Sequence, residues 1–202
     1  VGTLAAVPAS AMHVFNWLAT MWGGRIKFAA PMLFAVGAIM LFFASGAGGV
    51  VNTQMPLDFI THDSYWVVGH FHLMLMGTVS LGLTGFLYYL FPLMTGRMYN
   101  EKWAKIHFAL AFVGVIFVFV TQHLLGLYGM PRRVYDYVDS PELVMMNQIA
   151  TIGAFTVGIS YVIMVINMLR SAGKGKPADM EDPFKIGEEY YDYRRREPPI
   201  HH

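Results

Sequence analysis

Long runs of apolar residues, separated by short polar segments, dominate the chain. Uncharged runs extend over residues 1–22, 28–51, 65–94, 106–130 and 143–169. A helix needs about 20 apolar residues to cross a hydrocarbon core of about 30 Å. Helices of soluble proteins carry a polar face at the helical period, and these runs do not. The pattern predicts an all-α polytopic membrane protein with four full transmembrane helices, preceded by the end of a fifth.

Composition agrees with this class. Only 13% of the residues are charged, against roughly a quarter in soluble domains. Cysteine is absent, which excludes disulfides and thiolate metal sites. The net charge of +1 gives no reason to expect a nucleic-acid partner. Charged and tyrosine-rich sequence begins at Ser171, so we divide the chain into transmembrane helices at 1–170 and a tail at 171–202, which we expect to be ordered against a partner.

The charges are distributed unequally between the two ends of the predicted helices. Twelve of the fourteen lysines and arginines fall on one side together with the tail, and the positive-inside rule makes that side cytoplasmic. The opposite side carries the acidic residues Asp58, Asp63, Asp136, Asp139 and Glu142. Arg132 and Arg133 are the two basic residues on that acidic side, and their position needs an explanation.

His70-Phe71-His72 is the most informative motif, since ionisable groups within membrane helices are costly and usually functional. Helical residues two apart point about 200° away from each other, so the two imidazoles cannot chelate one ion. Each can hold a separate centre, and neutral imidazole is a common axial ligand of haem iron. The alternative is a pair of structural histidines that are hydrogen-bonded to neighbouring helices.

Two further pairs are predicted to lie in the same outer layer. His62-Asp63 precedes the histidine helix, where Asp63 or Ser64 caps its N-terminus or the pair binds a hard cation. Arg132-Arg133 is either an ordinary interfacial pair or a clamp for carboxylates such as haem propionates. The convergence of these features on one layer favours haem binding.

The remaining histidines and aromatic residues have structural explanations. His107 and His123 are expected to be interfacial or hydrogen-bonded residues, and the role of His13 stays open. Several aromatic residues near helix ends are typical of interfacial belts: Trp17, Trp22, Trp66, Tyr88, Tyr89 and Trp103. The methionines have no ligand-like spacing and are interpreted as packing residues.

Four segments resemble subunit I of the haem–copper respiratory oxidases, the cytochrome c and quinol oxidase superfamily. HDSYWVVGHFH at 62–72 resembles helix X, and WAKIHF at 103–108 the start of helix XI. QHLLGLYGMPRR at 122–133 is similar to the end of helix XI, and VFNWLAT at 14–20 to the end of helix VIII. The resemblance covers residues 1 to about 170 and implies the part of a twelve-helix bundle from about helix VIII to helix XII.

The resemblance implies a role for each candidate on helix X. His70 would be the proximal ligand of the high-spin haem, where O₂ is reduced to water. His72 would be an axial ligand of the low-spin haem, and Phe71 would lie between the two haems. The haems would be of a and a3 type, with o or b type possible.

The resemblance also implies roles at the outer surface. His62 and Asp63 would bind Mg²⁺ or Mn²⁺, and Arg132 and Arg133 would hold haem propionates. The copper ligands, the second axial ligand of the low-spin haem and the proton pathways would lie on earlier helices. We therefore expect the N-terminal half of subunit I as a partner, either a separate chain or a missing portion.

Other expected partners are subunits II and III, membrane lipid, and an electron donor such as cytochrome c, a blue copper protein or a quinol. The expected location is a prokaryotic cell membrane or the mitochondrial inner membrane, with coupled proton translocation. Three alternatives are a nitric oxide reductase of the same superfamily, a non-catalytic membrane bundle and a bis-histidine membrane cytochrome. The sequence does not identify the electron donor, the haem type or the pumping stoichiometry.

Overall fold

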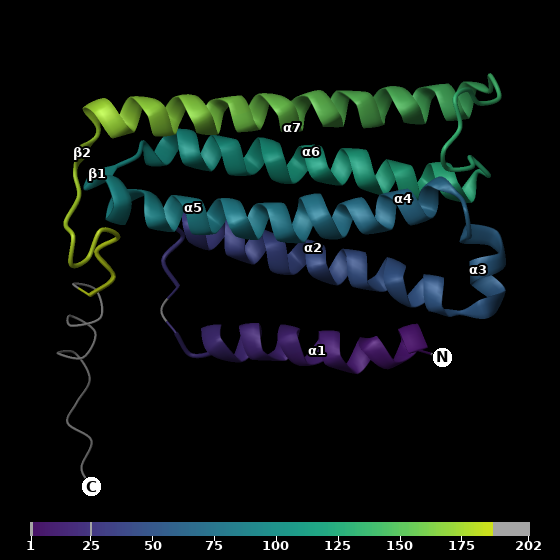
Figure 1. The fold of residues 1–202 in the computed structure, drawn as a ribbon, viewed down its shortest axis with the longest axis horizontal. Helices are drawn as coiled ribbons and strands as arrows, with labels where there is room; N and C mark the ends of the chain where they lie inside the picture. Colours follow the sequence, from purple (N-terminus) through teal and green to yellow (C-terminus); the bar gives the residue numbers. More distant parts are fainter. Residues whose placement is uncertain (1, 25, 188–202) are drawn as a thin grey trace, which may run out of the picture.

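The structure, a computed structural model, describes residues 2–24 and 26–187 as a bundle of long helices (Figure 1). Within them, four helices are long and apolar enough to cross a membrane. They are α2 (Ala30–Thr53), the continuous span of α4 (Tyr65–His72), η1 (Leu73–Val79) and α5 (Ser80–Thr95), α6 (Glu101–Leu127) and α7 (Pro141–Lys174). The four predicted membrane helices are confirmed.

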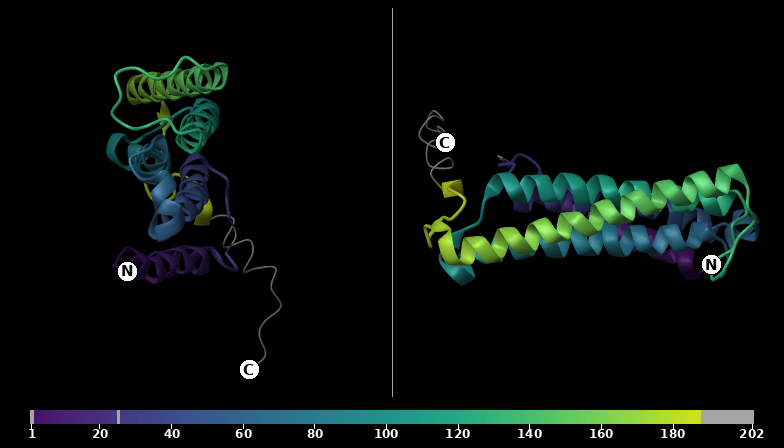
Figure 2. Two further views of the ribbon diagram at one scale, coloured as in Figure 1. Left: turned by 90° about the vertical axis from the view of Figure 1, so that its right-hand side faces the viewer. Right: turned by 90° about the horizontal axis from the view of Figure 1, so that it is seen from above.

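Two shorter helices complete the bundle. α1 (Gly2–Met21) lies at one edge of the bundle (Figure 2). α3 (Met55–Thr61) joins α2 to α4 at the acidic end (Figure 1). The other end, where α5, α6 and α7 meet, carries most of the basic residues. The charge asymmetry seen in the sequence therefore separates the two ends of the bundle.

The first residue of a helix is determined by its capping residue, and the hydrophobic pattern alone does not locate it. The Asn100 side chain accepts hydrogen bonds from the backbone N–H groups of Lys102 at 3.0 Å and Trp103 at 3.4 Å. Helix α6 therefore begins at Glu101, five residues before the predicted start, because a side-chain cap satisfies N–H groups that would otherwise be unpaired. Ser140 caps α7 in the same way, accepting from Leu143 N at 3.3 Å.

Helices α6 and α7 pack closely through facing glycines. A Cβ on Gly114 would lie 3.0 Å from the carbonyl oxygen of Gly153, and a Cβ on Gly153 would lie 2.9 Å from Val118 N. Small residues allow the two backbones to approach closely. In lipid there is no hydrophobic driving force between helices, so the van der Waals contacts of this close packing hold them together. Phe155 on α7 faces outward and is 70% exposed, as expected for a surface that meets lipid or other helices.

A polar cluster is buried between helices towards the basic end. Tyr88 and His107 are both fully buried, and Tyr88 Oη lies 3.0 Å from His107 Nδ1. The prediction that Tyr88 belongs to an interfacial belt is therefore wrong, because this ring faces α6 rather than the membrane surface. Its hydroxyl needs a partner inside the bundle, and His107 provides one, as expected for a hydrogen-bonded structural histidine.

Residues 175–187 fold back over the helix ends. The two-residue strand β1 (Arg97–Met98) pairs antiparallel with β2 (Lys176–Pro177). Phe184 is 8% exposed and stacks on Tyr89 with ring centroids 5.7 Å apart. This part of the predicted tail therefore packs against the chain's own helices, while residues 188–202 lie outside the described residues.

Candidate functional site

His70 and His72 approach different helices. His70 lies against α2, with its Nδ1 atom 3.4 Å from Ser45 Oγ. The His72 ring stacks on Phe119 of α6, with centroids 5.6 Å apart and planes 13° apart. Phe71, between them in sequence, is 40% exposed and lies 4.2 Å from the His72 ring. The two imidazoles thus occupy separate surroundings on one helix.

The hydrogen bonds of both rings leave the Nε2 atom available. His72 Nδ1 lies 2.9 Å from the carbonyl oxygen of Val68, which can only accept, so this nitrogen carries the hydrogen. Ser45 donates its hydroxyl hydrogen to the His70 carbonyl oxygen at 3.1 Å, so Ser45 Oγ can accept from His70 Nδ1. An Nδ1–H group held by a backbone or side-chain oxygen is the usual arrangement when Nε2 binds a metal.

Two glycines of α2 make room for these rings. A Cβ on Gly48 would lie 3.3 Å from His70 Nδ1 and 3.2 Å from His123 Nε2, and a Cβ on Gly49 would lie 3.1 Å from His70 Cε1. Sequence reasoning missed Ser45, Gly48 and Gly49. The small-residue run SGAGG at 45–49 was the available signal, because glycine permits close approach of another group to the backbone.

His123 belongs to the same layer. Its Nδ1 atom lies 2.6 Å from the carbonyl oxygen of Phe119, and its ring packs edge-on against Trp66 at 4.7 Å. The expectation of a hydrogen-bonded histidine is met, although its position beside His70 was not foreseen. His13 is elsewhere, on α1, where its exposed ring stacks near Trp17 at 6.2 Å.

The helix changes its winding directly after His72. Residues Leu73–Val79 form the π-helical segment η1, in which each turn holds more residues than in an α-helix. Such segments are rare and are often found at functional sites. The widened turn follows the two histidines without a break in the span.

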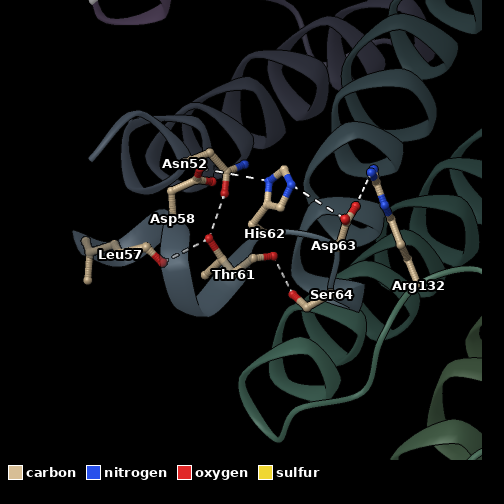
Figure 3. Close-up of polar contacts among 8 residues, drawn as sticks. All are labelled: Asn52, Leu57, Asp58, Thr61, His62, Asp63, Ser64 and Arg132. Atoms are coloured by element: carbon tan, nitrogen blue, oxygen red, sulfur yellow. Dashed lines mark hydrogen bonds and ion pairs between the residues drawn. The ribbon is translucent and has the colours of Figure 1, made fainter. Parts of the chain in front are cut away.

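His62, Asp63 and Arg132 come together at the acidic end (Figure 3). Asp63 forms an ion pair with Arg132 Nη2, and its carbonyl oxygen accepts from Arg132 N at 2.8 Å. His62 Nε2 lies 3.5 Å from Asp63 Oδ2, and His62 Nδ1 lies 3.9 Å from Asp58 Oδ2. Ser64 caps α4, accepting from Trp66 N at 3.2 Å. Within residues 2–24 and 26–187, no three His, Cys, Asp or Glu side chains are arranged to hold a metal ion.

The two arginines differ in their surroundings. The Arg132 side chain is 25% exposed, and its Nε atom is buried without a hydrogen-bond partner. Arg133 is exposed and adopts a positive φ of 61°. The unpaired Nε–H of Arg132 is a donor that a bound carboxylate would satisfy.

The sequence of this chain matches a known protein family. The sequence model of the family described as "Cytochrome C and Quinol oxidase polypeptide I" matches residues 1–156. The chain belongs to the cytochrome c and quinol oxidase polypeptide I family. It is 41% identical over 186 residues to cytochrome c oxidase polypeptide 1 of Halobacterium salinarum, covering 92% of this chain and 31% of that protein.

Other comparisons agree on this oxidase family. Cytochrome c oxidase subunit 1 of Alkalihalophilus pseudofirmus is 41% identical over 184 residues, covering 91% of this chain and 29% of that protein. A solved heme-copper terminal oxidase dimer has a similar fold, with a TM-score of 0.65 at 22% identity over 75% of this chain and 28% of that chain. The chain therefore spans about a third of the length of the relatives that it matches.

Proposed function

We propose that this chain is part of the catalytic subunit of a terminal respiratory oxidase, which reduces O₂ to water with coupled proton translocation. The observation that supports the proposal is the pair His70 and His72. Their Nε2 atoms are available for ligation on one membrane helix, and their rings lie against different neighbouring helices. A single bis-histidine haem would instead need two rings that face one centre.

In this proposal His70 holds the high-spin haem and His72 is one axial ligand of the low-spin haem. The haems, of a and a3 or of o or b type, and the copper supply the redox chemistry when bound. The protein's part is to orient the imidazoles. Ser45 and the Val68 carbonyl fix the two Nδ1–H groups. The Phe71 ring lies beside His72 and would contact a haem held there.

Arg132 and Arg133 hold haem propionates in this proposal. The buried and unpaired Nε–H of Arg132 fits a carboxylate ligand, and Asp63 fixes the other end of the same guanidinium. His62 and Asp63 are the proposed contribution to a Mg²⁺ or Mn²⁺ site. Two side chains do not complete such a coordination shell, so the remaining ligands come from water or a partner chain.

The remaining machinery comes from other polypeptide segments. The copper ligands and the second axial ligand of the low-spin haem lie in the N-terminal half of subunit I. Subunits II and III, surrounding lipid and an electron donor such as cytochrome c, a blue copper protein or a quinol complete the system. The basic end of the bundle and the tail face the cytoplasm of a prokaryotic cell, or the corresponding side of the mitochondrial inner membrane.

An optical spectrum of the purified complex that contains this chain tests the proposal. We expect two haems, one low-spin and one high-spin, with carbon monoxide binding to the high-spin haem alone. A complex without haem would indicate a non-catalytic bundle. A single low-spin haem would indicate a membrane cytochrome, and turnover of nitric oxide without O₂ consumption would indicate a reductase of the same superfamily.

Replacing Arg132 with glutamine is expected to lower the midpoint potential of the haem whose propionate it contacts. Loss of a nearby positive charge favours the oxidised haem, which carries the more positive charge. The shift should be on the order of 60 mV, the equivalent of a tenfold change in a one-electron equilibrium. Redox titration followed by absorbance measures it, and Arg132→Lys, which keeps the charge, is the control. Unchanged potentials in Arg132→Gln would refute the propionate role.

A further inference from the structure

A cavity of about 970 Å³ lies at the basic end of the bundle, between the start of α6 and the end of α7. Its cationic lining residues are Lys102, Arg170, Lys174 and Lys176. All four are exposed, and in the part of the chain that the structure describes none of them pairs with a carboxylate. Among residues 2–24 and 26–187, the cavity therefore gathers positive charge that no carboxylate compensates.

The single acidic residue among the described lining residues is already engaged. Glu101 Oε1 accepts a hydrogen bond from Ala30 N at 2.7 Å and pairs with Lys105 Nζ at 3.7 Å. Lys105 does not line the cavity. Glu101 therefore does not neutralise the four lining cations, and the net charge within the cavity stays positive.

Neutral polar groups also line the cavity. Asn167 joins the helices by accepting from Asn100 N at 3.1 Å and donating to the Asn100 carbonyl oxygen at 3.0 Å. Tyr99, which is 4% exposed, also lines the cavity, and its hydroxyl oxygen is buried without a well-formed hydrogen bond within the described residues. Burial, followed by the negative charge of Glu101, raises the pKa of Tyr99, so its hydroxyl stays a neutral donor.

The apolar surroundings fit a lipid better than a free ion. Trp103 and Leu169 line the same cavity and are 39% and 71% exposed. Tryptophan at a helix end is typical of the membrane interface, and the outer face of α7 continues from Leu169 into the membrane with exposed Val165 and Val162. An acyl chain can follow this face while its phosphate lies among the cations.

We propose that this cavity binds the headgroup of an anionic phospholipid, such as phosphatidylglycerol or cardiolipin. Basic pockets between transmembrane helices recognise such headgroups through their phosphates. Arg170 and Lys174, one helical turn apart on α7, contact the phosphate, while Trp103 and Leu169 contact the glycerol and the first methylenes. The site is separate from the histidine layer at the opposite end of the bundle, and its test needs no oxidase activity.

Photo-crosslinking in nanodiscs tests the proposal with the intact oxidase complex. Photoreactive phosphatidylglycerol, at low mole fraction in phosphatidylcholine, is expected to label peptides that contain Trp103 or Leu169. Photoreactive phosphatidylcholine at the same fraction should label them much less. Equal labelling by the two probes would overturn the proposal. Absence of labelling by either, as expected if another polypeptide covers the cavity, would overturn it as well.

Charge variants provide the second measurement. Each cation near a membrane contributes roughly 1 kcal/mol to binding of anionic lipid, so the double variant Arg170→Gln/Lys174→Gln should weaken labelling by phosphatidylglycerol roughly thirty-fold. Lys185→Gln, an exposed cation at the same end but outside the cavity, is the matched control and should label like the wild type. Unchanged labelling in the double variant would refute the site.

Discussion

His70→Ala is expected to abolish O₂ reduction by the assembled oxidase, while the low-spin haem stays in place. His72→Ala should remove the low-spin signal and stop electron delivery to the O₂ site. Each variant deletes a proposed iron ligand, so the activity loss should exceed the roughly 10- to 100-fold effect typical of changing an outer-shell partner. Difference spectra with dithionite and carbon monoxide, together with oxygen-electrode rates, measure the two effects separately.

Two comparisons distinguish ligation from general damage in this experiment. Added imidazole can enter the space left by each alanine, and partial recovery of the missing spectrum is expected only for a lost ligand. His123→Gln alters a ring in the same layer that is already hydrogen-bonded to the Phe119 carbonyl oxygen, and it should keep both haem signals. Retention of both signals in His72→Ala would show that this imidazole is not a ligand.

Gly126→Ala is expected to produce the largest loss of stability among the glycine-to-alanine substitutions in the described part of the chain. A Cβ at this position would lie 2.7 Å from Trp66 Cα and Cβ, and closer still to Trp66 N. The obstacle is the backbone of α4, which cannot move away as a flexible side chain would. Overpacking of this kind typically costs about 1–3 kcal/mol and sometimes more, and we expect a cost of about 3 kcal/mol.

The same substitution should also reduce haem content, because α4 carries both His70 and His72. Thermal unfolding of the purified complex and haem per polypeptide measure the two consequences. Gly158→Ala on α7 is the matched control, since nothing lies within 4 Å of the Cβ that it would add. It should change stability by no more than about 1 kcal/mol. A Gly126→Ala protein as stable as this control would contradict the tight crossing of α4 and α6.

Hydropathy and charge were enough to predict the four membrane helices and the two ends of the bundle. The same information placed the start of α6 five residues late, because the last charge before the apolar run, Lys105, lies inside the helix that Asn100 caps. Tyr88 was misplaced for a related reason. Distance along a helix indicates depth in the membrane, but only packing determines which side of the helix is buried.

The candidate site was predicted in part. The two-residue spacing of His70 and His72 was visible because helical geometry fixes the angle between neighbouring side chains. The roles of Ser45 and Gly48 were not visible, because they come from a helix that precedes the histidines by more than twenty residues. The contact between Asp63 and Arg132 also joins distant segments, and Asp63 adopts a positive φ of 55° there.

The π-helical segment η1 separates the two α-helical halves, α4 and α5, of one continuous membrane span. The half nearer the acidic end carries His70 and His72, and in the half nearer the basic end Tyr88 contacts His107. One residue of an α-helix corresponds to about 100° of rotation about the helix axis. The wider winding of η1 therefore changes the direction in which the side chains of α5 point relative to those of α4. Removing a single residue from Leu73–Val79 would leave a helix of nearly the same length with one half turned away from its partners. The span is therefore defined as much by its rotational register as by its hydrophobicity.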